Sequence, residues 1–294
     1  MTFRSGFIGI VGPPNAGKST LLNRMLGKKL AIVSPKPQTT RTRIIGVLNR
    51  ADCQMIFMDT PGIHRTKTAL HESMVESALA AFHEVDLLLV MLDATRADGF
   101  DTGPLLGHLD GLKKPCILVM NKIDRVSKKS LLPKMDACRK EFPFDAILPV
   151  SALKGDGVDI LLDELKKRLE PGPRLFPEDM ETDQSEQALI SELIREKIYH
   201  HMNKELPYSA AVTVERLEDL PHKNLLLISA CIHVETESQK KIFIGRKGRT
   251  IKAIGRAARL ELERVFEGKV YLELRVRVEK NWGKDAKALR RLGY

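Results

Sequence analysis

The sequence predicts an α/β protein of two domains, a doubly wound and mostly parallel sheet followed by a smaller α+β domain. Short apolar runs alternate with longer amphipathic segments over the first 170 of the 294 residues, which is typical of strand-helix units. Glycine-proline steps and acidic residues then interrupt the pattern near residues 171–180. The positive charge of the chain is concentrated after this interruption, so the two parts differ in composition as well as in pattern.

The first domain is expected to span residues 1–172. Its apolar runs predict strands at 7–11, 44–48, 55–58, 87–92, 117–120 and 146–150. Helices are expected at 19–26, 69–82, around Leu105, at 131–142 and at 158–169. The four residues at 49–52 that link the second and third strands predict a hairpin, so one strand of the sheet should be antiparallel.

Residues 173–183 are expected to be a linker, and residues 184–294 a second domain that ends in a basic tail. Its pattern predicts a helix at 184–202, strands at 211–217 and 225–234, a short strand at 241–244, a basic helix at 250–266 and a strand at 270–278. No internal repeat is visible.

Composition excludes several classes of protein. Hydrophobic residues make up 43% and charged residues 29% of the chain, as in globular proteins. The longest nearly apolar stretch, 85–92, is far shorter than a membrane-spanning helix, and the first residues do not read as a secretory signal. The four cysteines lack the spacing of a zinc site or a disulfide framework. We therefore expect a cytoplasmic protein without a structural metal. A monomeric state is a further expectation.

The net charge of +10 comes entirely from the C-terminal end. Residues 239–294 contain 17 Lys and Arg against 6 Asp and Glu, a net charge of +11, so the preceding 238 residues carry −1. A solvated surface seldom concentrates charge so unevenly. The distribution favours a polyanionic partner for the second domain.

Residues 12–19 read GPPNAGKS between a predicted strand and a predicted helix, which is the phosphate-binding P-loop motif. Backbone N–H groups of such a loop and the N-terminus of the following helix bind phosphate. Lys18 is placed to reach the β- and γ-phosphates and the Ser19 hydroxyl to bind Mg²⁺. The predicted nucleotide contacts of this loop are Gly12, Asn15, Ala16, Gly17, Lys18, Ser19 and Thr20.

Asp59-Thr-Pro-Gly62 follows the third predicted strand, 41 residues beyond Lys18. An acidic residue at this position can hold the Mg²⁺ shell, and the Gly62 N–H can meet the γ-phosphate. Loss of that phosphate would then release the loop. A DTPG sequence alone is only a turn signal; its place after a strand makes it informative.

Asn121-Lys-Ile-Asp124 ends another predicted strand, at the edge where open α/β sheets bind ligands. The Asp124 carboxylate can accept from guanine N1–H and the exocyclic amine, a pair of donors that adenine lacks. Ser151, Ala152 and Leu153 follow the last strand and suit a backbone N–H to guanine O6. Predicted guanine-side contacts are therefore Asn121, Lys122, Asp124, Ser151, Ala152 and Leu153.

A GxxG turn at 245–248 precedes the basic helix of the second domain. A KH module uses such a turn to clamp the backbone of single-stranded nucleic acid. We expect Ile251, Ile254, Ala258 and Leu262 to form the buried stripe of the helix. The predicted RNA contacts are Gly245, Arg246, Lys247, Gly248, Lys252 and Arg256.

The motifs of the first domain are similar to those of the translation-factor-like GTPases of the TRAFAC class, and the details resemble the Era family. Residues 37–43, PQTTRTR, resemble the Era effector loop; by that pattern Thr40 ligates Mg²⁺ in the GTP state and Thr39 is its neighbour. The order of elements after residue 184 resembles a type 2 KH domain. Residues 177–180, 190–198 and 281–294 also resemble Era sequences, so the resemblance runs from Gly12 to Tyr294.

This resemblance implies GTP hydrolysis, with Lys18, Thr40 and Gly62 as the catalytic residues and Ser19, Thr40 and Asp59 as the Mg²⁺ residues. Ile63 stands where Ras-like proteins place a water-orienting glutamine, which leaves the hydrolytic mechanism open. In several relatives an asparagine at the position of Asn15 helps to bind a K⁺ that stimulates hydrolysis; simple hydrogen bonding within the loop is the alternative here. The family also implies binding of the 3′ end of 16S ribosomal RNA, a role in assembling the small ribosomal subunit, and peripheral contact with the inner membrane.

Two alternatives remain open at the level of the sequence. Because Ile63 cannot orient water, the chain could be a nonenzymatic RNA-binding scaffold that retains GTP. The KH module could also dock a protein instead of RNA.

Overall fold

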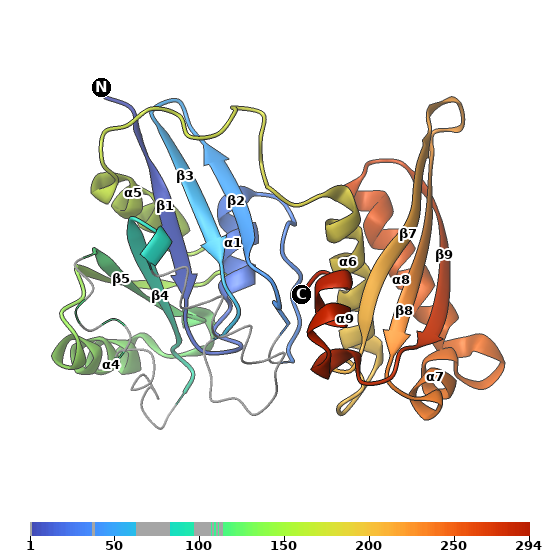
Figure 1. Cartoon of the computed structure of the whole chain (residues 1–294). Coiled ribbons are helices and arrows are strands. Elements are labelled where there is room, and N and C mark those ends of the chain that lie inside the picture. Colours follow the sequence, from blue (N-terminus) through green and yellow to red (C-terminus); the bar gives the residue numbers. More distant parts are fainter. Residues whose placement is uncertain are drawn as a thin grey trace. The chain divides into compact units, whose positions relative to one another are not determined.

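The computed structural model describes residues 2–36, 39–62, 83–96, 107, 109, 111 and 114–294. The described chain forms two compact units (Figure 1). The first unit takes residues 2–31, 40–62 and 83–183 as far as they are described, and the second takes 32–36, 39 and 184–294. The chain thus passes from the second unit back into the first between Thr39 and Thr40.

A six-stranded sheet forms the centre of the first unit. Its strands are β1 (Arg4–Val11), β2 (Ile44–Asn49), β3 (Cys53–Asp59), β4 (Leu87–Asp93), β5 (Cys116–Asn121) and β6 (Ala146–Val150), in the order β2-β3-β1-β4-β5-β6. Only the β2–β3 pair of this sheet is antiparallel. The predicted doubly wound sheet and its antiparallel hairpin are therefore confirmed, and five of the six strands are one to three residues longer than predicted.

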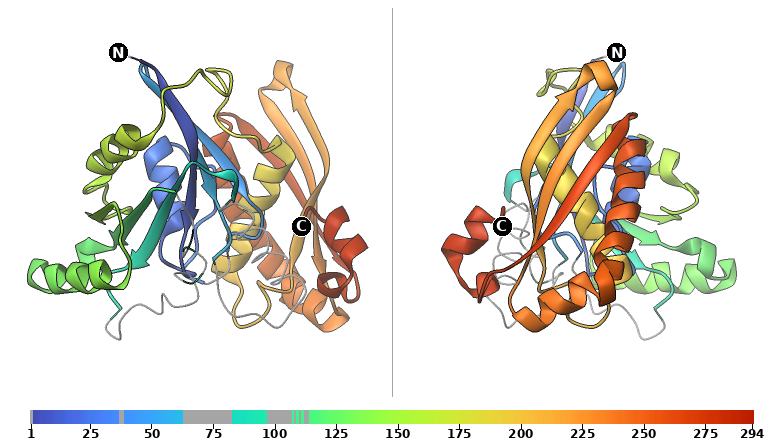
Figure 2. Two further views of the ribbon diagram at one scale, coloured as in Figure 1. Left: turned by 60° about the vertical axis from the view of Figure 1, so that its left-hand side comes forward. Right: turned by 90° about the vertical axis from the view of Figure 1, so that its right-hand side faces the viewer.

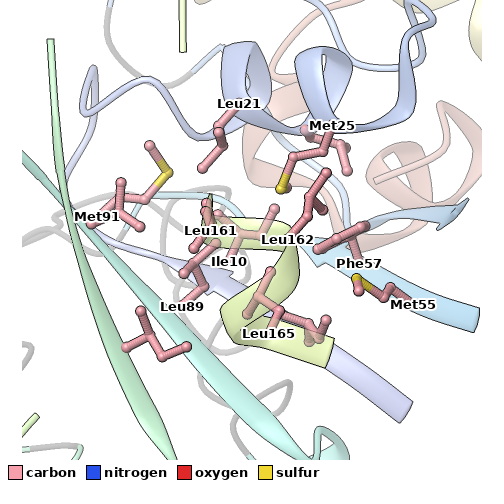
Figure 3. Close-up of a cluster of buried hydrophobic side chains, with 14 of the residues drawn as sticks. Ile10, Leu21, Met25, Met55, Phe57, Leu89, Met91, Leu161, Leu162 and Leu165 are labelled. Carbon is pink, nitrogen blue, oxygen red and sulfur yellow. The ribbon is translucent and has the colours of Figure 1, made fainter. Parts of the chain in front are cut away.

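Alternation along the strands builds a core on each face of this sheet. Leu87, Leu89 and Met91 of β4 pack in the cluster that α1 (Lys18–Leu26) and α5 (Val158–Arg168) cover, as Figure 3 shows for part of it. Leu88 and Val90 point to the opposite cluster, which α4 (Lys128–Glu141) joins through Cys138. Burial on both faces explains why the strands read as continuous apolar runs.

The segment expected to be a linker runs along the first unit and is fixed to it. Thr182 pairs with Gly46 of β2 as an isolated bridge, and the Gln54 side chain accepts from the N–H groups of Leu175 and Phe176 at 2.7 and 2.9 Å. Gln54 is fully buried, so these bonds satisfy an amide that would otherwise be costly to bury.

The second unit is a three-stranded sheet with two long helices packed against it (Figure 2). The strands are β7 (Ala211–Leu220), β8 (Leu225–Val234) and β9 (Lys269–Val278), with β7–β8 antiparallel and β8–β9 parallel. The helices are α6 (Glu186–His201) and α8 (Arg249–Val265), and α9 (Ala286–Arg291) near the C-terminus was not predicted. Ile254, Ala258 and Leu262 form the buried stripe of α8 as expected.

Residues 32–36 and Thr39 are held by α6 as part of this second unit. The Val33 N–H donates to Glu196 Oε1 at 3.0 Å, and an Arg195 N–H donates to the Thr39 carbonyl at 2.5 Å. Ile32 is buried in the same core as α6 and α8. The segment that leads to the predicted Mg²⁺ threonine is therefore anchored by several bonds.

The predicted short strand at 241–244 is wrong: these residues end helix α7 (Glu237–Ile244). Thr236 caps the helix, since its hydroxyl accepts from the Gln239 N–H at 3.2 Å while Gln239 Oε1 accepts from the Thr236 N–H at 3.3 Å. This capping box lies outside the short segment KIFI, whose three consecutive apolar residues suggested a strand. The GxxG turn consequently joins two helices.

Some expectations fall outside the described residues, namely the helices at 69–82 and around Leu105. Within the described part of the chain, no helix is both long enough and apolar enough to cross a membrane. All four cysteines are buried and unpaired.

The N-cap at Thr236 should stabilise helix α7 locally, which can be tested by mutation. Thr236→Ala should lower the free energy of opening of the α7 amides by about 1 kcal/mol, the usual worth of an N-cap side chain. Native-state hydrogen exchange on the full chain measures it. Ser238→Ala removes an exposed hydroxyl from the second residue of the same helix. It is the matched control and should change opening far less; equal effects would contradict the cap.

Candidate functional site

The P-loop connects the end of β1 to the first residue of α1 and depends on two glycines. A Cβ on Gly12 would lie 2.4 Å from the Met91 carbonyl oxygen, and one on Gly17 would lie 2.2 Å from Asn121 Nδ2. Both glycines also have positive φ, which side chains rarely tolerate. Asn15 is exposed, with a φ of 64°, and Thr20 lies in the first turn of α1.

Lys18 is buried under this loop. Its ammonium group donates to the carbonyl oxygens of Gly12 and Pro13 at 3.0 and 3.1 Å. Burial lowers the pKa of Lys18 to about 8, although the nearby Asp59 carboxylate opposes this change. A phosphate group beside the ammonium would raise the pKa of Lys18 again, because a nearby anion favours the charged form. The site is therefore suited to an anionic ligand.

Three oxygen-bearing side chains from separate segments meet beside Lys18. Ser19 Oγ lies 2.6 Å from Asp59 Oδ2 and 2.8 Å from Thr40 Oγ1, and Thr40 Oγ1 lies 3.5 Å from the same Asp59 oxygen. These are the three residues predicted to hold Mg²⁺, and the fold brings them together although they are up to 40 residues apart in the chain.

The burial of the Asp59 carboxylate is only partly compensated by its neighbours. Burial raises its pKa to about 6, against the opposing effects of Lys18 and of the hydrogen bonds from Ser19 and Thr40. Its second oxygen, Oδ1, is buried without a hydrogen-bond partner. Mg²⁺ prefers oxygen ligands, and this site offers a buried carboxylate oxygen without a partner together with two hydroxyl groups. The residues present therefore fit this ion.

Gly62 lies against the P-loop, as the predicted γ-phosphate contact requires. A Cβ at this position would come within 2.9 Å of Pro14 N and 3.0 Å of Pro14 Cγ. The Thr60 hydroxyl donates to the Ile10 carbonyl at 3.0 Å and fixes the start of the segment. Ile63, which bears on the mechanism of hydrolysis, lies outside the described residues.

The predicted guanine side of the site forms at the carboxyl end of β5. The buried Asn121 side chain donates from Nδ2 to the Ala16 carbonyl at 2.7 Å and accepts at Oδ1 from the Ala152 N–H at 3.0 Å. Ser151 Oγ donates to Asp124 Oδ1 at 2.7 Å, which orients that carboxylate. Asn121, Asp124, Ser151 and Ala152 thus meet as expected.

Two further residues of this side were missed by the sequence reasoning. Lys122 Nζ pairs with Asp93 Oδ2 at 2.6 Å, and Arg24 Nε donates to the Ala152 carbonyl at 3.2 Å, next to the exposed Leu153. Asp93 is the last residue of β4 and could have been found by asking which polar residues end parallel strands. Arg24 gave no comparable signal, since it is one basic residue in a helix.

In the second unit, both glycines of the GxxG turn have a positive φ. Gly245 and Gly248 have φ values of 73° and 74°, and a Cβ on Gly245 would lie 2.2 Å from Thr250 Oγ1. Arg246 and Lys247 between them are exposed. The turn therefore presents two cations and a close approach to the backbone.

A groove of about 300 Å³ follows α8 beyond this turn. Lys252 and Arg256, two of the residues predicted to contact RNA, line it together with Arg259, Leu272 and Leu274. Ile251 also lines the groove and is only partly buried, so its assignment to the buried stripe was wrong. The groove has an apolar wall and cationic side chains, a combination suited to bases and phosphates.

Comparison with known families assigns both units. Residues 7–122 match the family model described as a 50S ribosome-binding GTPase, and residues 205–283 match that of the KH domain. GTPase Era of Syntrophus aciditrophicus is 50% identical over 99% of this chain and 95% of its own length, and that of Geobacter metallireducens is 46% identical over 99% and 98%.

The chain belongs to the Era family of GTPases.

Two solved structures share the fold along the whole chain. A structure of Aquifex aeolicus Era bound to GDP and AlF4⁻ has a TM-score of 0.95, and a structure of Era with MgGDPNP and nucleotides 1506–1542 of 16S ribosomal RNA has one of 0.94. Each is 42% identical and covers 99% of both chains. The chain is thus a GTPase with a KH domain, and the alternative of a nonenzymatic scaffold is set aside.

The geometry of Asp124 predicts a change of base preference. Asp124→Asn should weaken GTP binding by at least about 100-fold and favour xanthosine triphosphate, because an amide can donate to the xanthine 2-oxo group but cannot accept from two guanine donors. Competition binding with both nucleotides measures the change. Asp136→Asn, an exposed carboxylate of α4, is the control; unchanged GTP selectivity in Asp124→Asn would contradict the role given to Asp124.

Proposed function

We propose that this protein is a GTP-operated switch that binds single-stranded 16S ribosomal RNA near its 3′ end and acts in the assembly of the small ribosomal subunit. The observation that carries the proposal is a GxxG turn with its cationic groove on the same chain as a P-loop GTPase site. The Era structure that contains nucleotides 1506–1542 of 16S ribosomal RNA supports the choice of RNA.

In this proposal the P-loop and the edge of the sheet hold the nucleotide from its two ends. Lys18 turns from the loop carbonyls to the β- and γ-phosphates, and N–H groups of the loop bind the phosphate oxygens. Asp124 accepts from the guanine base, with Ser151 orienting the carboxylate. The Gly62 N–H meets the γ-phosphate, so the segment after it responds to hydrolysis.

Ser19, Thr40 and Asp59 would hold the Mg²⁺. When bound, this ion neutralises charge on the phosphate oxygens. Thr40 is the residue of the three that belongs to the effector segment, so its hydroxyl links that segment to the state of the nucleotide. Thr39 differs from it, because its hydroxyl donates to the Lys36 carbonyl at 2.9 Å.

Neighbouring threonines provide a matched test of this assignment. Thr40→Ala should raise the Mg²⁺ concentration needed for half-maximal hydrolysis by about tenfold, the effect of losing one ligand-type interaction of about 1.4 kcal/mol. Mg²⁺ titration of the hydrolysis rate measures it. Thr39→Ala should leave the titration within about twofold of the unchanged protein. The reverse order would assign the ligand to Thr39 instead.

We also propose that K⁺ stimulates hydrolysis, with Asn15 as its protein contact. Asn15 is an exposed residue in the P-loop, at the position that the family resemblance marks. Hydrolysis in K⁺ should then exceed that in Na⁺ by on the order of tenfold or more, with Asn15→Ala reducing the K⁺ rate toward the Na⁺ rate. Equal turnover in the two buffers would remove K⁺ from the mechanism and leave Asn15 as a loop residue.

RNA binding would begin at the GxxG turn. Arg246 and Lys247 meet phosphates, Gly245 and Gly248 permit close approach of the backbone, and Lys252 and Arg256 continue the cationic wall. A KH domain that docks protein is the second candidate. It predicts no salt-dependent binding of short RNA, whereas phosphate contacts predict affinity that falls steeply with salt.

Two glycines with similar backbones allow a matched test of the RNA site. Gly248→Asp should weaken binding of 16S ribosomal RNA oligonucleotides by tenfold or more, on the order of 1.4 kcal/mol, because it places a carboxylate beside the phosphate path. Gly293→Asp introduces the same side chain at another positive φ where nothing lies within 4 Å, and should bind normally. GTP hydrolysis without RNA should persist in both; equal loss of binding and hydrolysis in Gly248→Asp would contradict a separable RNA site.

The proposed partner places the protein in the cytoplasm. The positive charge of residues 239–294 also suits peripheral contact with anionic lipid headgroups at the inner membrane. A monomeric state stays a prediction.

A further inference from the structure

Arg24, in the last turn of α1, binds two consecutive carbonyl groups of the loop that follows β6. Its Nε donates to the Ala152 carbonyl at 3.2 Å, and its Nη2 donates to the Leu153 carbonyl. The guanidinium also lies close to Gly155, where a Cβ would come 3.9 Å from Nη1. Arg24 thus joins the helix that begins at Lys18 to the loop predicted to meet the guanine base.

The helix dipole alone does not account for these contacts. A cation in the last turn of a helix is favourable without any partner outside the helix. Arg24 instead directs two N–H groups at carbonyls of a segment 128 and 129 residues further along the chain. The planar fork of a guanidinium suits two neighbouring acceptors, because its N–H groups are held at fixed angles. The contact therefore acts on the loop and not only on α1.

The two carbonyls determine where the N–H groups of their peptide units point. No peptide bond among the described residues is cis, so the C=O and N–H of each unit face in opposite directions. The Ala152 carbonyl shares its peptide unit with the Leu153 N–H, and the Leu153 carbonyl shares its unit with the Lys154 N–H. Because both carbonyls face Arg24, both of these N–H groups point away from it.

One of these two donors has a partner, and the other is open. The Lys154 N–H donates to Ser151 Oγ at 3.2 Å, and that hydroxyl donates to Asp124 Oδ1 at 2.7 Å. The Ala152 N–H is also occupied, by a side-chain acceptor at 3.0 Å. The Leu153 N–H donates to no atom of the described chain. It is therefore the donor of this loop that remains for a ligand on the side of Asp124.

A fixed N–H at this place suits the 6-oxo group of guanine. That group accepts hydrogen bonds and is adjacent to the N1–H that Asp124 would accept, whereas adenine carries an amine donor at the same position. A fixed donor therefore favours guanine and disfavours adenine. The bonds from a cation also polarise the two peptide units, which strengthens their N–H groups as donors.

We propose that Arg24 is a positioning residue for guanine selection, which holds the carbonyls of Ala152 and Leu153 so that the Leu153 N–H meets the 6-oxo group of the base. The proposal rests on the guanine contacts proposed above and adds a residue of α1 to them. Since α1 is a single helix that starts at Lys18, one element then holds both the phosphate end and the base end of the site.

Nucleotides that differ at the 6-position test this role. The full chain with Arg24→Met is titrated with GDP, inosine diphosphate and 2-aminopurine riboside diphosphate, each in competition with a fluorescent GDP analogue. GDP and inosine diphosphate carry the 6-oxo group, and the 2-aminopurine nucleotide lacks it. Affinity for the first two should fall by about fivefold, the usual effect of one hydrogen bond, and affinity for the third should change by less than about twofold.

The controls separate positioning from a general effect on the fold. Lys28→Met removes a cation just beyond the end of α1, where it pairs with Glu181, and should bind all three nucleotides as the unchanged protein does. Arg24→Gln should repeat the pattern of Arg24→Met. Equal loss for the three nucleotides, or no loss, in these Arg24 variants would overturn the positioning role. Failure of Asp124→Asn to change base preference would instead overturn the guanine contacts on which the role rests.

Discussion

The hydrogen bonds of one buried amide, Asn121, hold the nucleotide site together. Its two polar atoms join the P-loop at Ala16 to the loop after β6 at Ala152. These two loops are 136 residues apart in sequence, and Asn121 bonds to both of them. Because both atoms of a 2% exposed amide are satisfied, any shift of one loop would leave a buried polar group unpaired. The lack of a side chain at Gly17 is a consequence, since Asn121 occupies the space that a Cβ would need.

The site also buries two groups of opposite charge, the Lys18 ammonium and the Asp59 carboxylate. Lys18 has a lowered pKa and Asp59 a raised one, each mainly because of burial. The protein thereby holds a cation ready for phosphate and a carboxylate oxygen ready for a metal ion. An anionic ligand with its cation would favour the charged forms of both groups, because each would gain a partner of opposite charge.

Local motifs with a fixed mechanism were predicted well. GPPNAGKS, DTPG and NKID each follow a strand and each combine a turn with side chains of a specific binding chemistry. The fold brings them to one edge of the sheet, because the carboxyl ends of parallel strands lie at the same edge. The predictions for residues 241–244 and for Ile251 were wrong, because each depended on a contact outside the short segment of sequence that suggested it. KIFI contains three consecutive apolar residues, as a short buried strand would, yet the cap at Thr236 makes it the end of a helix. Ile251 follows the helical period of the core stripe but lies at its margin, where only the packing of β9 decides burial.

By itself the sequence determined the six strands of the first unit, the phosphate and guanine motifs and the position of the basic KH turn, because all of these depend on neighbours within a few residues. The tertiary structure alone decided which distant groups meet. It placed the oxygens of Ser19, Thr40 and Asp59 within 3.5 Å and paired Asp93 with Lys122. The predicted domain limits stay predictions, although the described chain groups residues 32–36 and 39 with α6. Such contacts depend on the packing of whole elements, which no local pattern encodes.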